Sequence, residues 1–292
     1  MSVPAASGAD SASDANSAAP GADRVADEIG RSRRPIDPQA VGALLTDPGA
    51  WSIAHVERTG STNSDLAGST DVPHGRVLIT QEQVAGRGRS GRDWFCPPGA
   101  GLMFSVLLRI PGIPADRRGW TGAVLGLAIV RAMDRACGVR AGLKWPNDVL
   151  IDGLKCAGIL GEAVEDAVVI GAGINVSLRA DELPREDATS LMLAGGRTDR
   201  QSLLAAILDE FGVLLGRWAA VGGDIDASGL RADYRAACVT IGARVRLELP
   251  GGDRLVARAA DVAVDGSLVV VGAFGARSSY SAADVVHLRP DR

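Results

Sequence analysis

Lysine is almost absent from this chain of 292 residues, in which Lys144 and Lys155 are the only two among 31 basic residues. Cysteine and histidine are also scarce, with four and three residues, and no CxxC motif or Cys/His ligand spacing is present. We therefore expect neither a zinc site nor a disulfide framework. A reducing cytoplasm fits this composition best.

Long apolar runs and a strong excess of one charge are lacking as well. No stretch reaches the roughly 18 to 20 apolar residues of a membrane helix, and the amino terminus does not read as a secretory signal. A formal net charge of −4 argues against a general binder of nucleic acid or membrane surfaces. We expect a cytoplasmic protein that contacts neither nucleic acid nor membrane.

Composition divides the chain into three segments. Residues 1–34 contain almost no large apolar side chains, which predicts a disordered leader because little surface can be buried there. Residues 35–238 mix helix and strand patterns and are long enough for one domain with its own core. Residues 239–292 show only short strands and turns, which is typical of a small SH3-like barrel.

The patterns of the larger domain predict both strands and helices. Strands are expected over residues 52–57, 77–83, 102–110, 143–151, 154–164 and 167–176, with the last two as antiparallel neighbours. Helices are expected within 37–50, over 116–137, after a capping box at 198–201, and over 224–237. In the small domain, strands are expected over 245–249, 255–262, 267–271 and 280–288.

An arginine- and glycine-rich segment, GRGRSGR, covers residues 86–92 and is called the arginine loop below. Glycine lets backbone amides approach an anion closely, and arginine adds charged donors for phosphate or carboxylate. The segment is not a P-loop, because it lacks GxxxxGK[ST] and runs into prolines. A solvated basic loop or a nucleic-acid contact remains the alternative. Trp94, just past the loop, is placed either to stack on a base or to pack in the core.

Both lysines lie in one segment, KWPNDVLIDGLKCAGIL, at residues 144–160. The string KWPND indicates a fixed turn that presents Lys144 and a carboxylate for function. The alternative reading is a purely structural turn in which Lys144 pairs with Asp148. Lys155 stands on a strand of otherwise apolar or small residues, where an unpaired charge is costly. Unless a protein carboxylate supplies its partner, a carboxylate or phosphate of a ligand would do so.

Several small polar residues complete the candidate site. Ser61, Thr62 and Asn63 form a cluster of small hydrogen-bonding groups, although by itself this tripeptide favours a helix N-cap role for Ser61 or Thr62. Gln83 ends a strand just before the arginine loop and either faces a ligand or faces solvent. The segment GAGIN at residues 171–175 ends a strand in glycines and Asn175, which allows close approach to a planar group or forms a simple turn.

The order of these motifs resembles that of the biotin protein ligases. STN is followed by QxxGRGRxGRxW, KWPNDV, KxAGIL, GxGIN, ATSL at residues 188–191 and a small all-β tail. The resemblance runs from about residue 51 to the end of the chain. It implies an α+β fold, with a mixed, largely antiparallel sheet and packed helices, as in class II synthetases, plus an SH3-like barrel.

The resemblance also implies a two-step reaction. The carboxylate of biotin attacks the α-phosphate of ATP, with Mg²⁺ expected alongside ATP, to give biotinyl-5′-AMP and pyrophosphate. A lysine amine of a biotin carboxyl carrier domain then displaces AMP. Some family members carry an N-terminal DNA-binding domain, and we expect none here because only about 16 plausibly ordered residues precede Trp51.

The resemblance assigns roles to individual residues. It implies that Lys155 and Arg89 are catalytic. The implied biotin-binding residues are Ser61, Thr62, Asn63, Gln83, Arg87, Gly88, Arg89 and Lys155. The implied ATP- and adenylate-binding residues are Arg87, Arg89, Arg92, Trp94, Lys144 and Asn175. This sequence departs mildly from the family pattern at two places. Cys156 stands where a larger aliphatic residue is common, and Cys96-Pro97-Pro98 stiffens the end of the arginine loop.

Two other functions compete with the biotin ligase. A lipoate or octanoyl transferase shares the fold family and also modifies a carrier lysine. A non-catalytic sensor of biotin or nucleotide that regulates transcription belongs to a different class. The GRGRxGR and KWPND strings favour biotin over lipoate, and the acidic charge weighs against a DNA-bound sensor.

Overall fold

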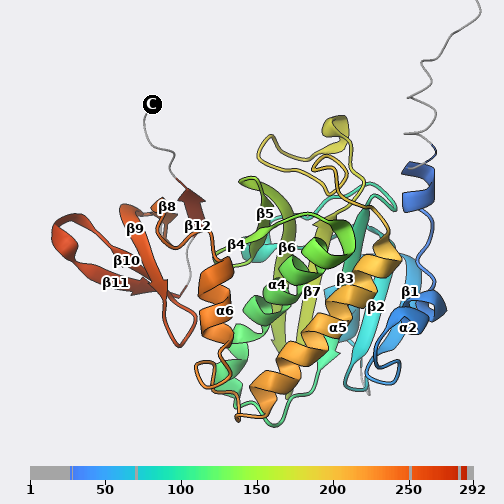
Figure 1. The fold of residues 1–292 in the computed structure, drawn as a ribbon, viewed down its shortest axis with the longest axis horizontal. Helices are drawn as coiled ribbons and strands as arrows, with labels where there is room; N and C mark the ends of the chain where they lie inside the picture. Colours follow the sequence, from blue (N-terminus) through green and yellow to red (C-terminus); the bar gives the residue numbers. More distant parts are fainter. Residues whose placement is uncertain (1–26, 28, 70–71, 250–251, 282–283, 288–292) are drawn as a thin grey trace, which may run out of the picture.

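The computed structural model describes residue 27 and residues 29–69, 72–249, 252–281 and 284–287. A seven-stranded sheet forms the larger part, in the order β1-β2-β3-β7-β6-β5-β4 (Figure 1). Only β1 and β2 are parallel within this sheet, and the other neighbouring pairs are antiparallel. The strands are β1 Ser52–Thr59, β2 Arg76–Gln83, β3 Gly101–Leu108, β4 Gly142–Lys144, β5 Asp148–Ile151, β6 Leu154–Val164 and β7 Ala167–Asn175.

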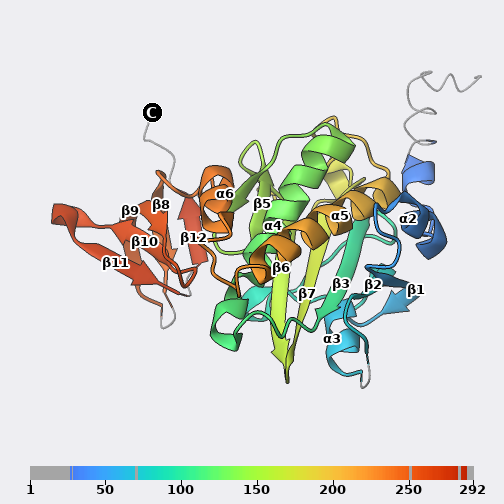
Figure 2. The same cartoon turned by 60° about the horizontal axis from the view of Figure 1, so that its bottom comes forward.

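Two long helices cover one face of this sheet, and a short helix lies on the other face (Figure 2). The long helices are α4 Thr121–Ala132 and α5 Arg200–Ala219, and the short one is α3 Thr62–Ala67. Helix α2 Pro38–Leu44 packs beside β1 and α5, and α6 Leu230–Ala237 contacts α4. The shorter turns are η1 Arg89–Gly91, η2 Ala115–Trp120, η3 Met133–Cys137, η4 Ala180–Glu182 and η5 Ala273–Gly275.

Strand β7 shows how the two faces differ. Ile170, Ala172 and Ile174 are buried in the main core together with residues of α4 and α5. Because successive side chains of a strand point to opposite faces, Gly171 and Gly173 lie on the side of α3. The sheet therefore has a packed face under α4 and α5 and a second face that carries glycines at its centre.

The C-terminal part forms a five-stranded antiparallel sheet in the order β11-β10-β9-β8-β12. Its strands are β8 Arg244–Glu248, β9 Arg254–Val262, β10 Leu268–Val271, β11 Arg277–Tyr280 and β12 Asp284–His287. Two indole N–H groups tie it to the larger part: Trp145 donates to Gly266 O at 2.9 Å and Trp120 to Val264 O at 2.6 Å. Apolar side chains of both parts belong to one core cluster.

The fold class predicted from the sequence is confirmed: a mixed, largely antiparallel sheet with packed helices and a small C-terminal β domain. Several element predictions need correction. The strand expected over 143–151 is a hairpin, β4 and β5, because the Trp145–Pro146 turn interrupts it. The helix expected over 116–137 begins as a 3-10 turn and ends as a π turn around α4. The described residues of the segment 280–288 do not form one strand: Tyr280 ends β11, Ser281 lies in a bend, and Asp284–His287 form β12.

The capping box expected at 198–201 is also wrong. Asp199, not Thr198, is the N-cap of α5, and its carboxylate accepts from the backbone N–H of Gln201 at 3.1 Å. Asp and Thr are both good N-caps, so the sequence alone did not separate two adjacent candidates.

The disordered leader expected over residues 1–34 is contradicted for residues 29–34, which the structure describes. The backbone N–H of Arg33 donates to Ile29 O within a helical turn. Arg33 and Ser32 also contact the larger domain through side-chain hydrogen bonds. Polar contacts, not apolar burial, hold this segment, which is why its composition did not reveal it. The prediction for residues 1–26 and 28 lies outside the described residues.

No helix in the described ranges combines the length and the apolar character that crossing a bilayer requires.

Candidate functional site

A chain of hydrogen-bonded polar side chains lies between α3 and the glycine-bearing face of the sheet. Gln83 Oε1 accepts from the backbone N–H of Thr62 at 2.9 Å, and Thr62 Oγ1 lies 2.7 Å from Ser105 Oγ. Ser105 Oγ donates to Asn63 Oδ1 at 2.6 Å, and Asn63 Nδ2 donates to Glu162 Oε2 at 2.9 Å. We call these five residues the polar cluster. It offers donors and acceptors in a fixed arrangement inside an otherwise apolar region.

Ser61 occupies the N-cap position of α3 but makes no capping hydrogen bond through its side chain. It is buried, as are its neighbours Thr62 and Asn63 of the polar cluster. The N-cap position predicted for Ser61 is therefore confirmed, although its hydroxyl makes no capping hydrogen bond.

Glycines form the floor under these side chains. A Cβ at Gly171 would stand 2.2 Å from Asn63 Oδ1 and 2.6 Å from Ser105 Oγ. A Cβ at Gly173 would stand 2.4 Å from Trp94 Cε2, and one at Gly158 would stand 3.2 Å from Trp94 Cζ3. We call Gly158, Gly171 and Gly173 the glycine floor. The sequence reading of GAGIN as a place of close approach thus has a concrete form: side chains lie directly on the backbone there.

Trp94 lies over β6 and β7, with its indole against Gly158 and Gly173. Its Nε1 is buried and has no hydrogen-bond partner. The Lys155 ammonium stands 5.8 Å from the centre of the ring, within reach of a cation–π interaction. Gly171 and Gly173 are about 6.6 Å apart along the strand. The polar cluster and Trp94 are therefore adjacent on one face.

The carboxylate of Asp148 lies near both lysines and forms an ion pair with one of them. Lys155 Nζ lies 2.6 Å from Asp148 Oδ1, and the two side chains are 27% and 17% exposed. Lys144 is the direct cross-strand neighbour of Asp148. Two ammonium groups against one carboxylate leave a net charge of +1, so this triad retains attraction for an anion. We call Lys144, Lys155 and Asp148 the lysine triad.

This arrangement corrects one expectation. Lys155 does have a protein carboxylate as its partner, namely Asp148, which the alternative reading of KWPND had paired with Lys144. The turn between β4 and β5 returns Asp148 to a place between both cations, and sequence spacing did not show which of them it would bind.

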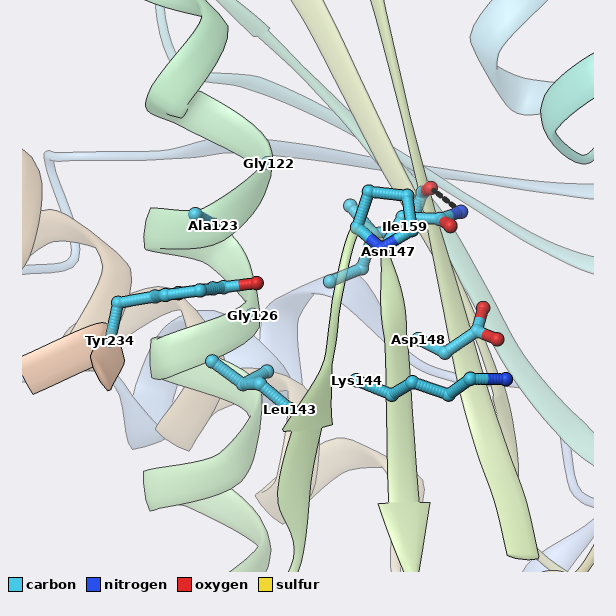
Figure 3. A pocket seen from close by; sticks show the side chains of 10 residues that line it. Gly122, Ala123, Gly126, Leu143, Lys144, Asn147, Asp148, Ile159 and Tyr234 are labelled. Carbon is cyan, nitrogen blue, oxygen red and sulfur yellow. Dashed lines mark hydrogen bonds between the residues drawn. The ribbon is translucent and has the colours of Figure 1, made fainter. Parts of the chain in front are cut away.

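Figure 3 shows the small pocket beside the triad, in which Lys144 and Asp148 point the same way, away from α4 and Tyr234. Asn147 Nδ2 donates to Ile159 O at 2.8 Å and fixes the turn to β6. The charged ends of Lys144 and Asp148 therefore project from the sheet on the side opposite the long helices.

The arginine loop is folded on itself. Gly88 N–H donates to Arg92 O at 2.6 Å and Trp94 N–H to Gly86 O at 2.9 Å, which makes a narrow hairpin. Ser90 and Gly91 at its tip have positive φ values of 57° and 70°. The hairpin places Trp94 and the arginines on one short ribbon, so movement of the loop would shift both together.

An open cleft of about 540 Å³ adjoins the site, and Arg89 and Glu162 are among its lining residues. It runs between β6, η2 and the C-terminal sheet, and Trp145 and Gly266 also line it. Of the site residues expected from the sequence, Arg89 is the only one on its wall within the described part of the chain. Glu162 links this cleft to the polar cluster through Asn63.

Asn175 ends β7 and is 2% exposed. Its Nδ2 donates to Thr189 O at 2.9 Å, while its Oδ1 is buried without a hydrogen-bond partner. Cys156 lies beside it, with Sγ 3.4 Å from Asn175 O. Burial raises the pKa of the Cys156 thiol to about 12, so this thiol stays protonated at neutral pH and is inert.

The structure thus brings most of the expected site residues onto one face. Ser61, Thr62, Asn63 and Gln83 gather at α3, and Trp94, Lys144, Lys155 and Asn175 gather around β5–β7. Arg87, Gly88 and Arg92 lie on the hairpin, where Arg87 and Asp93 form an isolated antiparallel β-bridge through their backbones.

Sequence reasoning missed Ser105 and Glu162. Ser105 is the single polar residue in the buried strand GLMFSVLL, and a hydroxyl at such a position needs a hydrogen-bond partner. That signal was present in the sequence and could have been used. Glu162 carried no such signal, because it lies on an alternating strand where a solvent-facing carboxylate is ordinary.

The electrostatics of Lys144 give a pH prediction. Burial lowers the pKa of its ammonium below the usual 10.5, with Asp148 opposing the shift and Lys155 adding to it. If its charge assists catalysis, activity should fall with rising pH at a value below 10.5, and Lys144→Arg should move this limb upward. Because the pKa of Lys144 is lower in the folded protein than in the unfolded chain, deprotonation of this group favours the folded state. Loss of its proton at high pH should therefore not lower the melting temperature. An alkaline limb that is unchanged in Lys144→Arg would contradict the assignment.

Comparison with known proteins defines the class of this chain. Residues 54–175 match the model of the Biotin/lipoate A/B protein ligase family. The chain is 40% identical over 270 residues to the biotin–[acetyl-CoA-carboxylase] ligase of Mycobacterium tuberculosis, covering 89% of this chain and 98% of that protein. The chain therefore belongs to the biotin/lipoate A/B protein ligase family.

Further relatives agree with this assignment. The bifunctional ligase/repressor BirA of Escherichia coli is 34% identical over 169 residues, which cover 54% of this chain and 52% of that protein. The structure of biotin protein ligase from Aquifex aeolicus in complex with biotin and ATP superposes with a TM-score of 0.70 at 25% identity, over 81% of this chain and 99% of that one. The resemblance to biotin protein ligases read from the motifs is confirmed.

Proposed function

We propose that this protein activates biotin with ATP to give biotinyl-5′-AMP and then transfers biotin to a lysine of the biotin carboxyl carrier domain of acetyl-CoA carboxylase. The observation that carries this is the 40% identity to a biotin–[acetyl-CoA-carboxylase] ligase across 98% of its length. The site supports it, because a hydrogen-bonding cluster and a net cationic triad lie on one glycine-floored face.

The first step joins two anions. A carboxylate oxygen of biotin attacks the α-phosphorus of ATP, the phosphorus–oxygen bond to the β-phosphate breaks, and pyrophosphate leaves. The two reactants repel one another in water, and fixed cations reduce that cost without reorganisation. Lys155 and Lys144 supply such cations beside Asp148, and Arg89 supplies another from the arginine loop. Trp94 and Asn175 provide a flat surface and an amide for adenine.

The second step is aminolysis of a mixed anhydride. The amine of the carrier lysine attacks the biotinyl carbonyl, loses a proton, and displaces AMP. Water competes for the same carbonyl, so the intermediate must be covered until the carrier arrives. The arginine hairpin, which carries Trp94 at its end, is suited to this cover.

Mg²⁺ would enter with ATP. Within the described residues, no group of three or more His, Cys, Asp or Glu side chains could hold a metal ion. Mg²⁺ in nucleotide sites is held mainly by phosphate oxygens, water and one or two carboxylates, so this finding is compatible with an ion carried by ATP. No step proposed here is assigned to it.

Biotin is favoured over lipoate by the chemistry of the polar cluster. The ureido ring of biotin has two N–H donors and a carbonyl acceptor, whereas the dithiolane ring of lipoate has no hydrogen-bonding group. Thr62, Asn63 and Ser105 would lose hydrogen-bonding partners against lipoate, which costs affinity. Biotin should therefore raise the melting temperature, and lipoate at the same concentration should not.

The direct test is mass spectrometry of a carrier domain incubated with this protein, ATP, Mg²⁺ and biotin. A mass increase of one biotinyl group on the carrier lysine is expected. Octanoylation or lipoylation in a parallel incubation, with no biotinylation, would overturn the proposal. A carrier whose target lysine is replaced by alanine serves as the control.

Arg89→Ala should weaken retention of the adenylate more than it weakens biotin binding. Arg89 lines the cleft on a hairpin that is proposed to cover the intermediate, whereas the ring of biotin is held elsewhere. Loss of one charged donor corresponds to roughly a tenfold faster release or hydrolysis of biotinyl-AMP. Equal losses for biotin and adenylate, measured by stopped-flow release, would speak against a loop that closes over the intermediate.

A further inference from the structure

Residues 32–34 form a short strap across the ends of β2, β3 and β7. Ser32 Oγ donates to Thr198 O at 3.0 Å, and the carbonyl of Arg33 accepts from Gln81 Nε2 at 3.0 Å. Gly99 lies beneath the strap with a positive φ of 70°, and a Cβ there would stand 2.6 Å from Arg33 O. The strap is thus in direct contact with the segment that leads out of the arginine loop.

Two arginines clamp the strap. Arg33 pairs with Glu182 at 2.6 Å and donates to Ser177 O at 2.8 Å. Arg200, which is 2% exposed, donates to Ser32 O at 3.0 Å, to Arg34 O, and to Gly101 O at 2.9 Å.

The guanidinium of Arg200 also donates to Gln81 Oε1 at 2.9 Å. Among the described residues, no carboxylate pairs with Arg200, and backbone carbonyls and one amide satisfy it instead. A buried cation held in this way fixes the backbone around it, because every lost acceptor would leave a donor unsatisfied.

The carbonyls that the clamp holds belong to the adenine side of the proposed site. Gly101, which accepts from Arg200, is the cross-strand partner of Asn175 in the pairing of β3 with β7. Ser177, which accepts from Arg33, follows Asn175 by two residues, and its N–H donates to Ala100 O at 2.8 Å.

Trp94, which follows the arginine loop, contacts the same region of the protein. It packs against a small apolar cluster of Cys96, Ala100, Met103 and Leu178, which lies just behind the segment that the strap covers. In contrast, the hydrogen bonds that join the polar cluster, as described above, reach no residue of the strap.

We propose that the strap, held by Arg33 and Arg200, positions Trp94 and Asn175 for the nucleotide and leaves the biotin half of the site unaffected. This inference rests on the proposed function. Arg33 and Arg200 are positioning residues, since they act on ATP through other groups.

The test is the effect of Arg33→Ala on each substrate separately, in the full chain. The KM for ATP should rise about tenfold, which corresponds to about 1.4 kcal/mol, while the Kd for biotin stays within about twofold. Arg31→Ala is the matched control: Arg31 lies in the same helical turn, is largely exposed and pairs only with Asp27 among the described contacts. It should leave both constants unchanged.

Glu182→Gln is the second variant, because it keeps the shape of the strap contact and removes its charge. It should shift the KM for ATP in the same direction by a smaller factor, with an unchanged melting temperature. An unchanged KM for ATP in both variants, or equal losses for ATP and biotin, would overturn the inference. Wild-type protein that fails to biotinylate a carrier would overturn the proposed function instead, so the two failures are distinguishable.

Discussion

Lys155→Ala should slow formation of biotinyl-AMP about 10²- to 10³-fold, as is typical when one preorganised donor to a developing charge is removed. Lys155 is the cation that pairs with Asp148 and lies near the Trp94 ring, where the proposed biotin and nucleotide halves of the site would meet. Without it, Asp148 neutralises Lys144 and the triad loses its net positive charge. Release of pyrophosphate in a single turnover measures the effect.

Two companion variants separate charge from structure. Asp148→Asn keeps both ammonium groups and should leave the adenylation rate far closer to that of the wild type than Lys155→Ala does. Lys155→Arg keeps the charge but not the compact geometry, so it should recover only part of the rate. The biotin affinity of Lys155→Ala should fall much less than its rate. Pyrophosphate release at a near wild-type rate in Lys155→Ala would refute the catalytic role.

Substitution of the floor glycines should separate the two substrates. Gly171→Ala would drive a methyl group into Asn63 and Ser105, so biotin affinity should fall, by about tenfold or more, as hydrogen bonds of the polar cluster are broken. Gly173→Ala would drive one into Trp94, so the KM for ATP should rise by a similar factor. Isothermal titration with biotin and steady-state kinetics with ATP distinguish these outcomes.

The variants Gly171→Ala and Gly173→Ala serve as controls for one another. The two glycines are two residues apart on one strand, so a general effect on β7 would weaken both substrates equally in both variants. Gly60→Ala, where an added Cβ meets nothing within 4 Å, should change neither constant. If Gly171→Ala and Gly173→Ala showed the same profile, the division into a biotin half and a nucleotide half would be wrong.

The elements around the site could be predicted because their residues carry local signals. The glycines of GAGIN, the string KWPND and the arginine loop each require special backbone or charge chemistry, and their order matched one family. Strands β6 and β7 were expected as neighbours because a tight turn joins them. The C-terminal strands were visible through their turns.

What could not be predicted depends on contacts between distant segments. Asp148 lies between two lysines because of the β4–β5 turn and a register shift in the pairing with β6, and spacing alone did not choose its partner. Arg200 reaches carbonyls of residues more than 160 positions away in the sequence. Backbone acceptors leave no trace in composition, so the strap was read as part of a disordered leader.

The central claim is that this site joins the carboxylate of biotin to the α-phosphorus of a nucleotide. The most direct measurement incubates the wild-type chain with biotin and ATP labelled at the α-phosphate, without any carrier domain, and separates the products. Biotin-dependent formation of labelled biotinyl-AMP that stays bound to the protein, with release of pyrophosphate, is the expected result. Label that appears only in ADP, or in AMP at a rate independent of biotin, would contradict the account.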